Sequence, residues 1–319
     1  MTVPPSPSAP GPGAPATVPS SDVLVVGGTG VDTVVRVDAL PVPLADSHPV
    51  GPIHEWPGQT GGNVALGCRA LNLDVTLIDF IGDDRPGRMV QERLAAGGVR
   101  CEPVHSPAGT RRAVNLVDPA GRRMSFYDAR AVPGARLPRE SFLPLLRRTR
   151  HVHLTIMDFA RHLFDDIAAL GVPVSTDLHD WDGAADHHRD FALRADLVFL
   201  SAARTGGRTP AVMREILRSG RAGAVVATAG ADGSWLLTRG GGDTPLRIPA
   251  ARPPAPVVDT NGAGDAYVSG FLHGRLAGLD PLSCARQGAV AGAYACTGEG
   301  TTALIGGAEL SAQVCTSGS

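Results

Sequence analysis

Residues 257–274 read VVDTNGAGDAYVSGFLHG, and this stretch decides which fold the chain should adopt. Asp259 is followed by a glycine-rich turn, and a second acid, Asp265, stands where a helical pattern begins. The first N–H groups of a helix lack intrahelical partners and lie at the positive end of its dipole, so they bind anions. Glycine at Gly262 and Gly264 removes the Cβ atoms that would keep a phosphate away. Asp265 could then accept a proton from an attacking hydroxyl, although first-turn acids are also common for dipole reasons alone.

The basic residues of the chain are unusual, because all 29 of them are arginine and none is lysine. A Walker A loop, a protein-kinase nucleotide site and Schiff-base chemistry all need a lysine, so these classes are excluded. The formal net charge of −2 leaves no basic surplus to neutralise many phosphates, and nucleic acid is therefore not expected as a partner.

Cysteine and proline usage indicates the compartment and the ends of the domain. The five cysteines are widely spaced, with no metal-binding pattern, which is typical of reduced thiols in a cytoplasmic protein. No apolar run is long enough to cross a membrane. Residues 1–20 carry seven prolines and predict a disordered tail, residues 21–310 a single domain, and residues 311–319 a flexible C-terminus.

Strand and helix patterns alternate along most of the chain. This predicts an α/β fold with a central, mostly parallel sheet covered by helices on both faces. Two alternating stretches, about 31–56 and 111–128, predict a small separate sheet that acts as a lid, the second as a hairpin across residues 118–122. The expected strands are 22–28, 74–82, 151–156, 172–177, 196–200, 223–229 and 234–238, and the expected helices are 61–72, 85–98, 161–170, 186–193, 210–219, 262–276 and 281–296.

The carboxyl ends of parallel strands form the edge at which open α/β sheets bind ligands. Polar residues follow several of the expected strands, and they should therefore gather on one rim. These residues are Asp158, Asp177, Ser201, Thr228 and Asp259.

Four ordered segments resemble the ribokinase (PfkB) family of carbohydrate and nucleoside kinases. DTNGAGDAYVSGFLHG is similar to the second signature of that family. GQTGGNVALGCRALNLDVTLIDFIGDDRPGR (58–88) is similar to the first signature, VVGGTGVD (25–32) to the first strand, and VVATAGADGSWLL (225–237) to the segment before the catalytic loop. The resemblance spans about residues 22–305 and implies a ribokinase-like fold, ATP with Mg²⁺, and transfer of the γ-phosphoryl group to an alcohol.

The resemblance also implies roles for individual residues. Asp265 becomes the general base, and the backbone N–H groups of Gly262, Ala263 and Gly264 form an anion hole that needs no lysine. The residues that the resemblance assigns to acceptor binding are Asp32, Gly61, Gly62, Asn63, Asp158 and Asp177. Those that it assigns to nucleotide binding are Ser201, Arg204, Thr228, Gly230, Asp259 and Thr260.

Two segments depart from the family pattern. SAAR (201–204) replaces the usual Asn-x-x-Glu, so magnesium must be held differently, through water with Asp177 or Asp180, or else Arg204 contacts phosphate directly. Arg204 as an ordinary surface residue is an equal alternative. Gln59 and Thr60 stand where sugar kinases often have Gly-Lys, so acceptor recognition should differ.

The N-terminal part and the expected hairpin resemble the branch of the family that phosphorylates acarbose, a pseudo-oligosaccharide. Trp56 or Trp181 could then lie against a sugar ring, although a role as a partly buried packing residue is favoured for either one taken singly. Ribokinase-, fructokinase- and nucleoside-type acceptors remain alternatives, as does a binding protein without activity. A lid-mediated homodimer is plausible because lid edges need cover. A remote alternative is a zinc hydrolase using His151, His153, Asp177 and His179, since alternate strand residues share a face.

Overall fold

The computed structural model describes residues 21–317, and the predicted tail over 1–20 lies outside them. Strand β1 (Ser21–Val26) lies inside a nine-stranded sheet and is buried on both faces. Val23 and Val25 belong to one hydrophobic cluster, whereas Leu24 and Val26 belong to the other, and all four are 0% exposed. A strand with two buried faces needs a continuous apolar run, which is the pattern that the sequence shows here.

The large sheet has the strand order β13-β12-β11-β10-β9-β8-β1-β4-β5. Its strands pair in parallel except at one edge, where β12 pairs antiparallel with both β11 and β13. The remaining members are β4 (Val75–Ile81), β5 (Arg100–His105), β8 (Thr149–Leu154), β9 (Val174–Asp177), β10 (Leu197–Ser201), β11 (Ala224–Thr228), β12 (Ser234–Thr238) and β13 (Leu246–Ile248).

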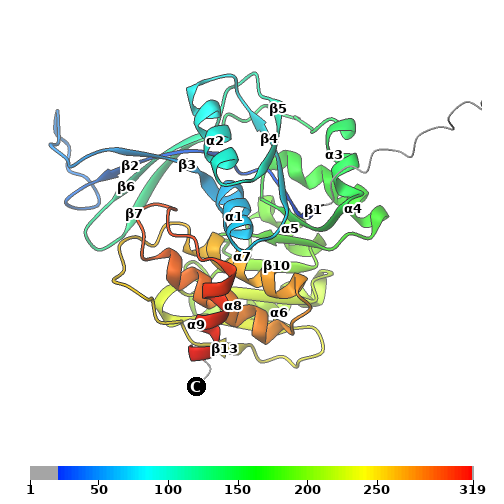
Figure 1. The fold of residues 1–319 in the computed structure, drawn as a ribbon. Helices are drawn as coiled ribbons and strands as arrows, with labels where there is room; N and C mark the ends of the chain where they lie inside the picture. The colour runs from blue at the N-terminus through cyan, green and yellow to red at the C-terminus, as the bar shows by residue number, and fades with distance from the viewer. Residues whose placement is uncertain (1–20, 318–319) are drawn as a thin grey trace, which may run out of the picture.

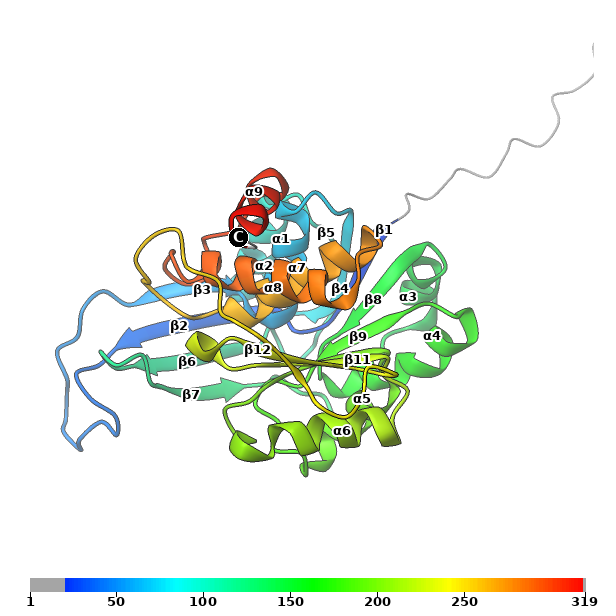
Figure 2. The same cartoon turned by 90° about the horizontal axis from the view of Figure 1, so that it is seen from below.

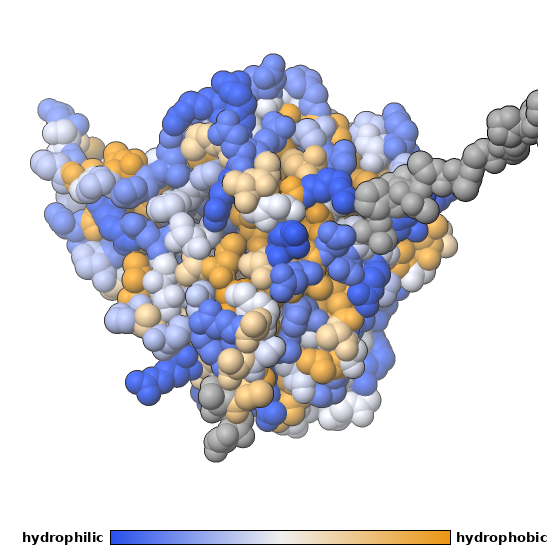
Figure 3. Space-filling view, in the orientation of Figure 1, coloured by the Kyte–Doolittle hydropathy of each residue, from blue (hydrophilic) through white to orange (hydrophobic). Residues whose placement is uncertain are grey.

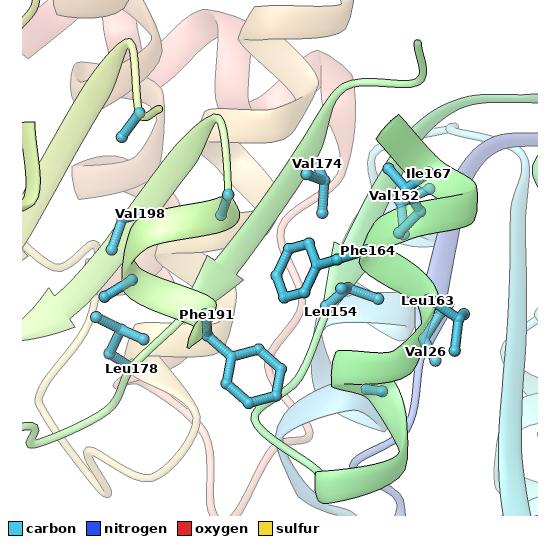
Figure 4. Packing of buried hydrophobic residues seen from close by; sticks show 14 of the residues in the cluster. Val26, Val152, Leu154, Leu163, Phe164, Ile167, Val174, Leu178, Phe191 and Val198 are labelled. Carbon is cyan, nitrogen blue, oxygen red and sulfur yellow. The ribbon is translucent and has the colours of Figure 1, made fainter. Parts of the chain in front are cut away.

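Helices cover both faces of this sheet, as Figures 1 and 2 show. One face carries α1 (Gln59–Ala70), α2 (Arg85–Ala96), α7 (Ala263–Leu276) and α8 (Pro281–Ala295). The other carries α3 (Arg139–Leu146), α4 (Phe164–Leu170), α5 (Asp186–Arg194) and α6 (Thr209–Ser219). Figure 4 shows how Phe164 and Phe191 pack from α4 and α5 toward Leu154 and Val174 of the strands.

A four-stranded sheet projects from the body and forms a lid, seen at the left of Figure 1. Its order is β3-β2-β6-β7, with β2 (Gly30–Arg36), β3 (His54–Gly58), β6 (Arg112–Val117) and β7 (Arg123–Asp128). β6 and β7 pair as an antiparallel hairpin, as predicted. Because strand side chains alternate, the two strands present one face to the body and one outward.

A buried ion pair holds the base of the lid. Arg111, just before β6, contacts Asp79 of β4 at 2.9 Å, and both side chains are almost fully buried. Thr29, just before β2, donates to Asp79 Oδ2 from its N–H at 2.7 Å and from its hydroxyl at 2.6 Å. Asp79 therefore binds both chain segments that enter the lid.

Several elements differ from the sequence prediction. Strands β5 and β13 and helix α3 were not predicted, α1 begins at Gln59 rather than residue 61, and a 3-10 turn (Asp158–Leu163) precedes α4. Residues 311–319 were predicted as a flexible C-terminus; residues 311–317 instead continue helix α9 (Gly307–Ser317), and 318–319 lie outside the described residues. This helix has a packing surface, since Leu310 is 0% exposed and clusters with Leu71, Val290 and Ile305. Over residues 21–317, no helix is long and apolar enough to cross a membrane.

Candidate active site

Two cavities meet between the lid and the carboxyl ends of the strands. The loop cavity, about 500 Å³, is lined by the 259–265 loop, the ends of β9 to β11 and the inner face of the lid. The lid cavity, about 320 Å³, lies between the lid, the start of α1 and residues 155–157. The two cavities share Thr60, Asn115, Arg123, His179, Asn261 and Asp265. Asp265 therefore faces both spaces, which is the position that a proton acceptor between two reactants requires.

Asp265 is buried, with 9% of its surface exposed. Burial raises the pKa of its carboxyl to about 7, although the hydrogen bond from Asn63 and the nearby His179 act in the opposite direction. Asn63 donates from Nδ2 to Asp265 Oδ2 at 2.8 Å, which leaves Oδ1 of the carboxyl free to accept from a ligand. A base with a pKa near neutrality combines sufficient basicity with a large deprotonated fraction.

The loop before Asp265 folds around Asp259 and Gly262. The carboxylate of Asp259 accepts from the N–H of Asn261 at 3.0 Å and from that of Gly300 at 3.0 Å. Gly262 caps α7 with φ of 75°, a left-handed conformation that favours glycine. The N–H of Ala263 reaches the carbonyl oxygen of Thr260 at 3.3 Å. Gly264, in contrast, opens into the loop cavity at the helix N-terminus, where N–H groups have no intrahelical partner.

Asp32 lies on β2 at the wall of the lid cavity. Gln59, at the start of α1, donates from Nε2 to Asp32 Oδ1 at 3.1 Å. Burial raises the pKa of Asp32, while the Gln59 hydrogen bond and Arg123 act to lower it. Gln59 and Thr60, the two departures noted in the sequence, both line the lid cavity.

Of the residues predicted to bind the nucleotide, four line the loop cavity and two do not. Ser201, Thr228, Asp259 and Thr260 line the loop cavity, together with Asp177 and Asp180. Arg204 does not line it; its side chain is 61% exposed, and its guanidinium lies 3.8 Å from Asp180, which fits the surface-residue alternative. Gly230 does not line the cavity either, and it serves the turn after β11 with φ of 56°.

Four predicted acceptor residues do not line the lid cavity: Asp177 lines the loop cavity instead, and Gly61, Gly62 and Asp158 line neither. The N–H of Gly61 donates to the carbonyl oxygen of Gly28 at 2.9 Å. A Cβ on Gly61 would overlap the carbonyl oxygen of Gly27, so this glycine permits close packing of α1. Asp158 is exposed and lines a third cavity, the distal cavity, which lies beside the lid cavity.

Some residues of the site were missed by sequence reasoning. The inner face of the lid hairpin presents Asn115, Arg123 and Tyr127 to the lid cavity. All three have odd numbers, and alternate residues of a strand share one face, so the sequence contained a signal that they lie together. Arg123 also donates to Asn261 Oδ1 at 3.2 Å and so joins the lid to the 259–265 loop.

The predicted tryptophans lie outside the site. Trp181 is buried and donates from Nε1 to the carbonyl oxygen of Ala185, whereas Trp56 stacks on His54. Neither of them lines the loop cavity or the lid cavity, which fits the packing alternative for both. Tyr127 is the aromatic side chain that lines the lid cavity.

The zinc-hydrolase alternative is wrong. His151 and His153 share a face of β8, but both bond to the hydroxyl of Ser175, at 2.8 and 2.9 Å. Burial lowers the pKa of His151 to about 3 and that of His153 to about 4, so both are neutral packing residues. Within the described part of the chain, no group of three His, Cys, Asp or Glu side chains could hold a metal ion.

Comparisons with known proteins agree with this fold. A family model for pfkB family carbohydrate kinases matches residues 191–305. Acarbose 7(IV)-phosphotransferase of Actinoplanes sp. is 48% identical over 278 residues, which cover 87% of this chain and 92% of that protein. The structure of a microbiome-derived acarbose kinase, Mak1, matches with a TM-score of 0.86 and 44% identity, and covers 93% of this chain. The ribokinase of Arabidopsis thaliana, solved with ribose and ATP, matches with a TM-score of 0.79 at 19% identity, which shows the fold alone.

The fold and the site thus define an ATP-dependent phosphotransferase with an alcohol group as acceptor. The chain belongs to the pfkB family of carbohydrate kinases. The ribokinase-like α/β fold with a small lid sheet, as the resemblance implied, is confirmed.

Proposed function

We propose that this protein transfers the γ-phosphoryl group of ATP to the 7-hydroxyl of the fourth unit of acarbose. The observation that carries the proposal is the 48% identity to acarbose 7(IV)-phosphotransferase across 87% of the chain. The match to the acarbose kinase Mak1 at 44% identity supports the same acceptor. Phosphorylation would inactivate the compound or protect a cell that makes it.

In this proposal Asp265 is the general base. The acceptor hydroxyl lies in the lid cavity and gives its proton to the free oxygen of the Asp265 carboxylate. The acceptor oxygen forms a bond to the γ-phosphorus, and the bond from that phosphorus to the leaving oxygen of ADP breaks. Asn63 holds the other carboxylate oxygen, at 2.8 Å, so the carboxyl has one orientation throughout. General-base catalysis contributes about 10²–10⁴-fold.

The phosphate groups would lie in the loop cavity, against the N-terminus of α7. The N–H groups there, with Gly264 at the opening, would stabilise the negative charge on the transferring group. Arg123 lines both cavities and adds positive charge to the same space. This arrangement supplies without lysine the stabilisation that other kinases obtain from one.

We propose that Mg²⁺ is held on the side of the loop cavity formed by Asp177 and Asp180. Carboxylate oxygens are the ligands that magnesium prefers, and both residues line that cavity. Asp259 lines it too, but both of its oxygens accept N–H groups, whereas Asp177 accepts one, from His179, through Oδ1. When bound, the metal neutralises phosphate charge, whereas positioning of the acceptor remains with Asp32, Asn63 and Asp265.

The decisive experiment incubates the protein with ATP, Mg²⁺ and one acceptor at a time, with mass detection of the product. Acarbose, ribose, fructose, adenosine and fructose 6-phosphate cover the alternatives. Acarbose should gain one phosphate, and chelation should abolish the reaction. Preferred phosphorylation of ribose, fructose or adenosine would assign the chain to a ribokinase, fructokinase or nucleoside-type acceptor instead. No transfer to any of the acceptors would favour a binding protein without activity.

We also propose a homodimer through the outer face of the lid, in the cytoplasm. Val114, Met124 and Phe126 are 38%, 38% and 59% exposed, and they lie on the hairpin that ends at edge strand β7. Figure 3 shows hydrophobic side chains among hydrophilic ones over this projection. Exposed apolar strands at a sheet edge call for cover by a partner. Light scattering should give a dimer that Phe126→Glu converts to a monomer; a monomeric wild type would contradict the proposal.

A further inference from the structure

We infer that a third cavity, beside the lid cavity, binds the remaining units of an oligosaccharide acceptor; this inference rests on the proposed function. This distal cavity measures about 640 Å³, and it extends from Tyr127 and Met157 to the 129–136 segment that follows the lid hairpin. Pockets of this size hold ligands of more than one ring. It is twice the volume of the lid cavity, which is about 320 Å³.

The distal cavity continues directly from the lid cavity. Tyr127, Ile156 and Met157 line both spaces. The hydroxyl of Tyr127 lies 3.9 Å from Met157 Sδ, so the lid and the body come together at this boundary through two side chains. A ligand with one ring at Asp265 would therefore pass Tyr127 as it extends away from the phosphoryl group.

The distal cavity lies on the far side of the acceptor from the nucleotide. It shares no lining residue with the loop cavity, whereas the lid cavity shares residues with each of them. The order is thus loop cavity, Asp265, lid cavity, distal cavity. Because the phosphates would occupy the loop cavity, the occupant of the distal cavity must be joined to the acceptor and not to the nucleotide.

The chemistry of the distal cavity suits carbohydrate. Phe80, Phe159 and Met157 supply apolar surface, which suits the C–H faces of sugar rings. Fixed polar groups stand at the rim: Arg161 donates to Asp158 at 3.0 Å, to Asp190 at 2.8 Å and to the carbonyl oxygen of His187 at 3.1 Å. Groups held in this way offer donors and acceptors to sugar hydroxyls without further ordering. Asp158, predicted for acceptor binding, belongs to this rim.

The name of the 48%-identical relative specifies the fourth unit of its acceptor, so three further units must find space when that unit is at the base. The lid cavity, at about 320 Å³, is the smaller of the two connected spaces. An acceptor of several units would consequently extend into the distal cavity, whereas a single sugar or a nucleoside would leave most of it unused.

The test fills the distal cavity and leaves the lid cavity intact. Ala131 and Val132 are exposed residues that line only the distal cavity, so Ala131→Trp and Val132→Trp should fold normally. The control is Ala95→Trp, on the exposed side of α2 and outside all three cavities. Calorimetric titration compares acarbose with acarviosine, the two-unit fragment that retains the phosphorylated unit.

Wild type and the control should bind acarbose at least about tenfold more tightly than acarviosine, a gap of about 1.4 kcal/mol. Each tryptophan variant in the distal cavity should reduce that ratio to about threefold or less, with the affinity for acarviosine unchanged. Equal binding of the two ligands by wild type, or an unchanged ratio in both variants, would overturn the distal site while leaving the acceptor assignment intact. Wild type that does not bind acarbose would overturn both.

Discussion

Asn63 and Asp265 are 202 positions apart in the sequence, yet Asn63 Nδ2 donates to Asp265 Oδ2 at 2.8 Å. The contact joins the two signature segments of the family in one side-chain pair, at the point where the loop cavity and the lid cavity meet. It orients the carboxyl and also opposes the rise in its pKa that burial causes.

Replacement of Asp265 by Asn should abolish the base but keep the shape of the site. We expect kcat to fall about 10²–10⁴-fold, with the KM values changed little, because the lost interaction belongs to the transition state. The control is Asp243→Asn, an exposed acid that lines none of the three cavities, which should keep full activity. Steady-state kinetics with acarbose and ATP make the comparison. A loss below about tenfold would remove Asp265 from the role of base.

The pH dependence should follow the same carboxyl. Because burial raises the pKa of Asp265 to about 7, kcat/KM should fall below pH 7 as the base becomes protonated. The Asn63 hydrogen bond favours the charged form, so Asn63→Ala should move this acidic limb to higher pH. An Asn63→Ala variant that loses activity without moving the limb would show that Asn63 acts on structure alone.

Stability should depend on pH in a corresponding way. Between the ordinary pKa of about 3.8 and the folded value of about 7, the folded state binds a proton that the unfolded state has released. Stability from this group therefore falls as the pH rises through that range. Asp265→Asn should then unfold at a higher temperature than wild type at pH 8.5 but not at pH 4.5. Differential scanning calorimetry at the two pH values tests this; a constant difference would place the cause elsewhere.

Two neighbouring glycines of α1 should respond differently to alanine. Gly61→Ala places a Cβ on the carbonyl oxygen of Gly27 and should destabilise the fold by roughly 2 kcal/mol or more, because backbone cannot move aside cheaply. Gly62→Ala is its matched control, since the nearest atom to a Cβ there is Thr29 Cγ2 at 3.8 Å. Alanine should be neutral or stabilising at that helical position. Urea unfolding compares the two, and equal losses would contradict this account.

The buried ion pair between Arg111 and Asp79 should contribute more to the free energy of unfolding than an exposed ion pair does. Arg111→Met leaves Asp79 charged and buried without its cation, which should cost about 3–5 kcal/mol of the free energy of unfolding. Arg36→Met, which removes an exposed pair at 3.6 Å from Glu299, should change stability little. Urea unfolding of both variants measures the contrast. Similar small losses would mean that Asp79 is satisfied by Thr29 alone.

Local patterns in the sequence predicted most of the fold. The apolar run of β1, the alternation along the lid hairpin and the glycine-rich start of α7 each reflect steric or burial rules within a few residues. Those rules fail where no local signal exists. Helix α9 is stable because Leu310 packs on a cluster formed by distant segments, and neither β5 nor β13 has a strong strand pattern of its own.

The candidate site likewise contains some features that the sequence predicted and others that only the tertiary structure revealed. The position of Asp265 in the first turn of a helix, after a left-handed Gly262, was determined by the sequence alone, because local sterics and the helix dipole set both. Only the tertiary structure decided that Gln59 bonds to Asp32, that Tyr127 rather than a tryptophan lines the lid cavity, and that Arg204 does not line the loop cavity. These contacts depend on how the lid packs against the sheet, and that packing follows from long-range burial and strand register, which no short stretch of sequence specifies.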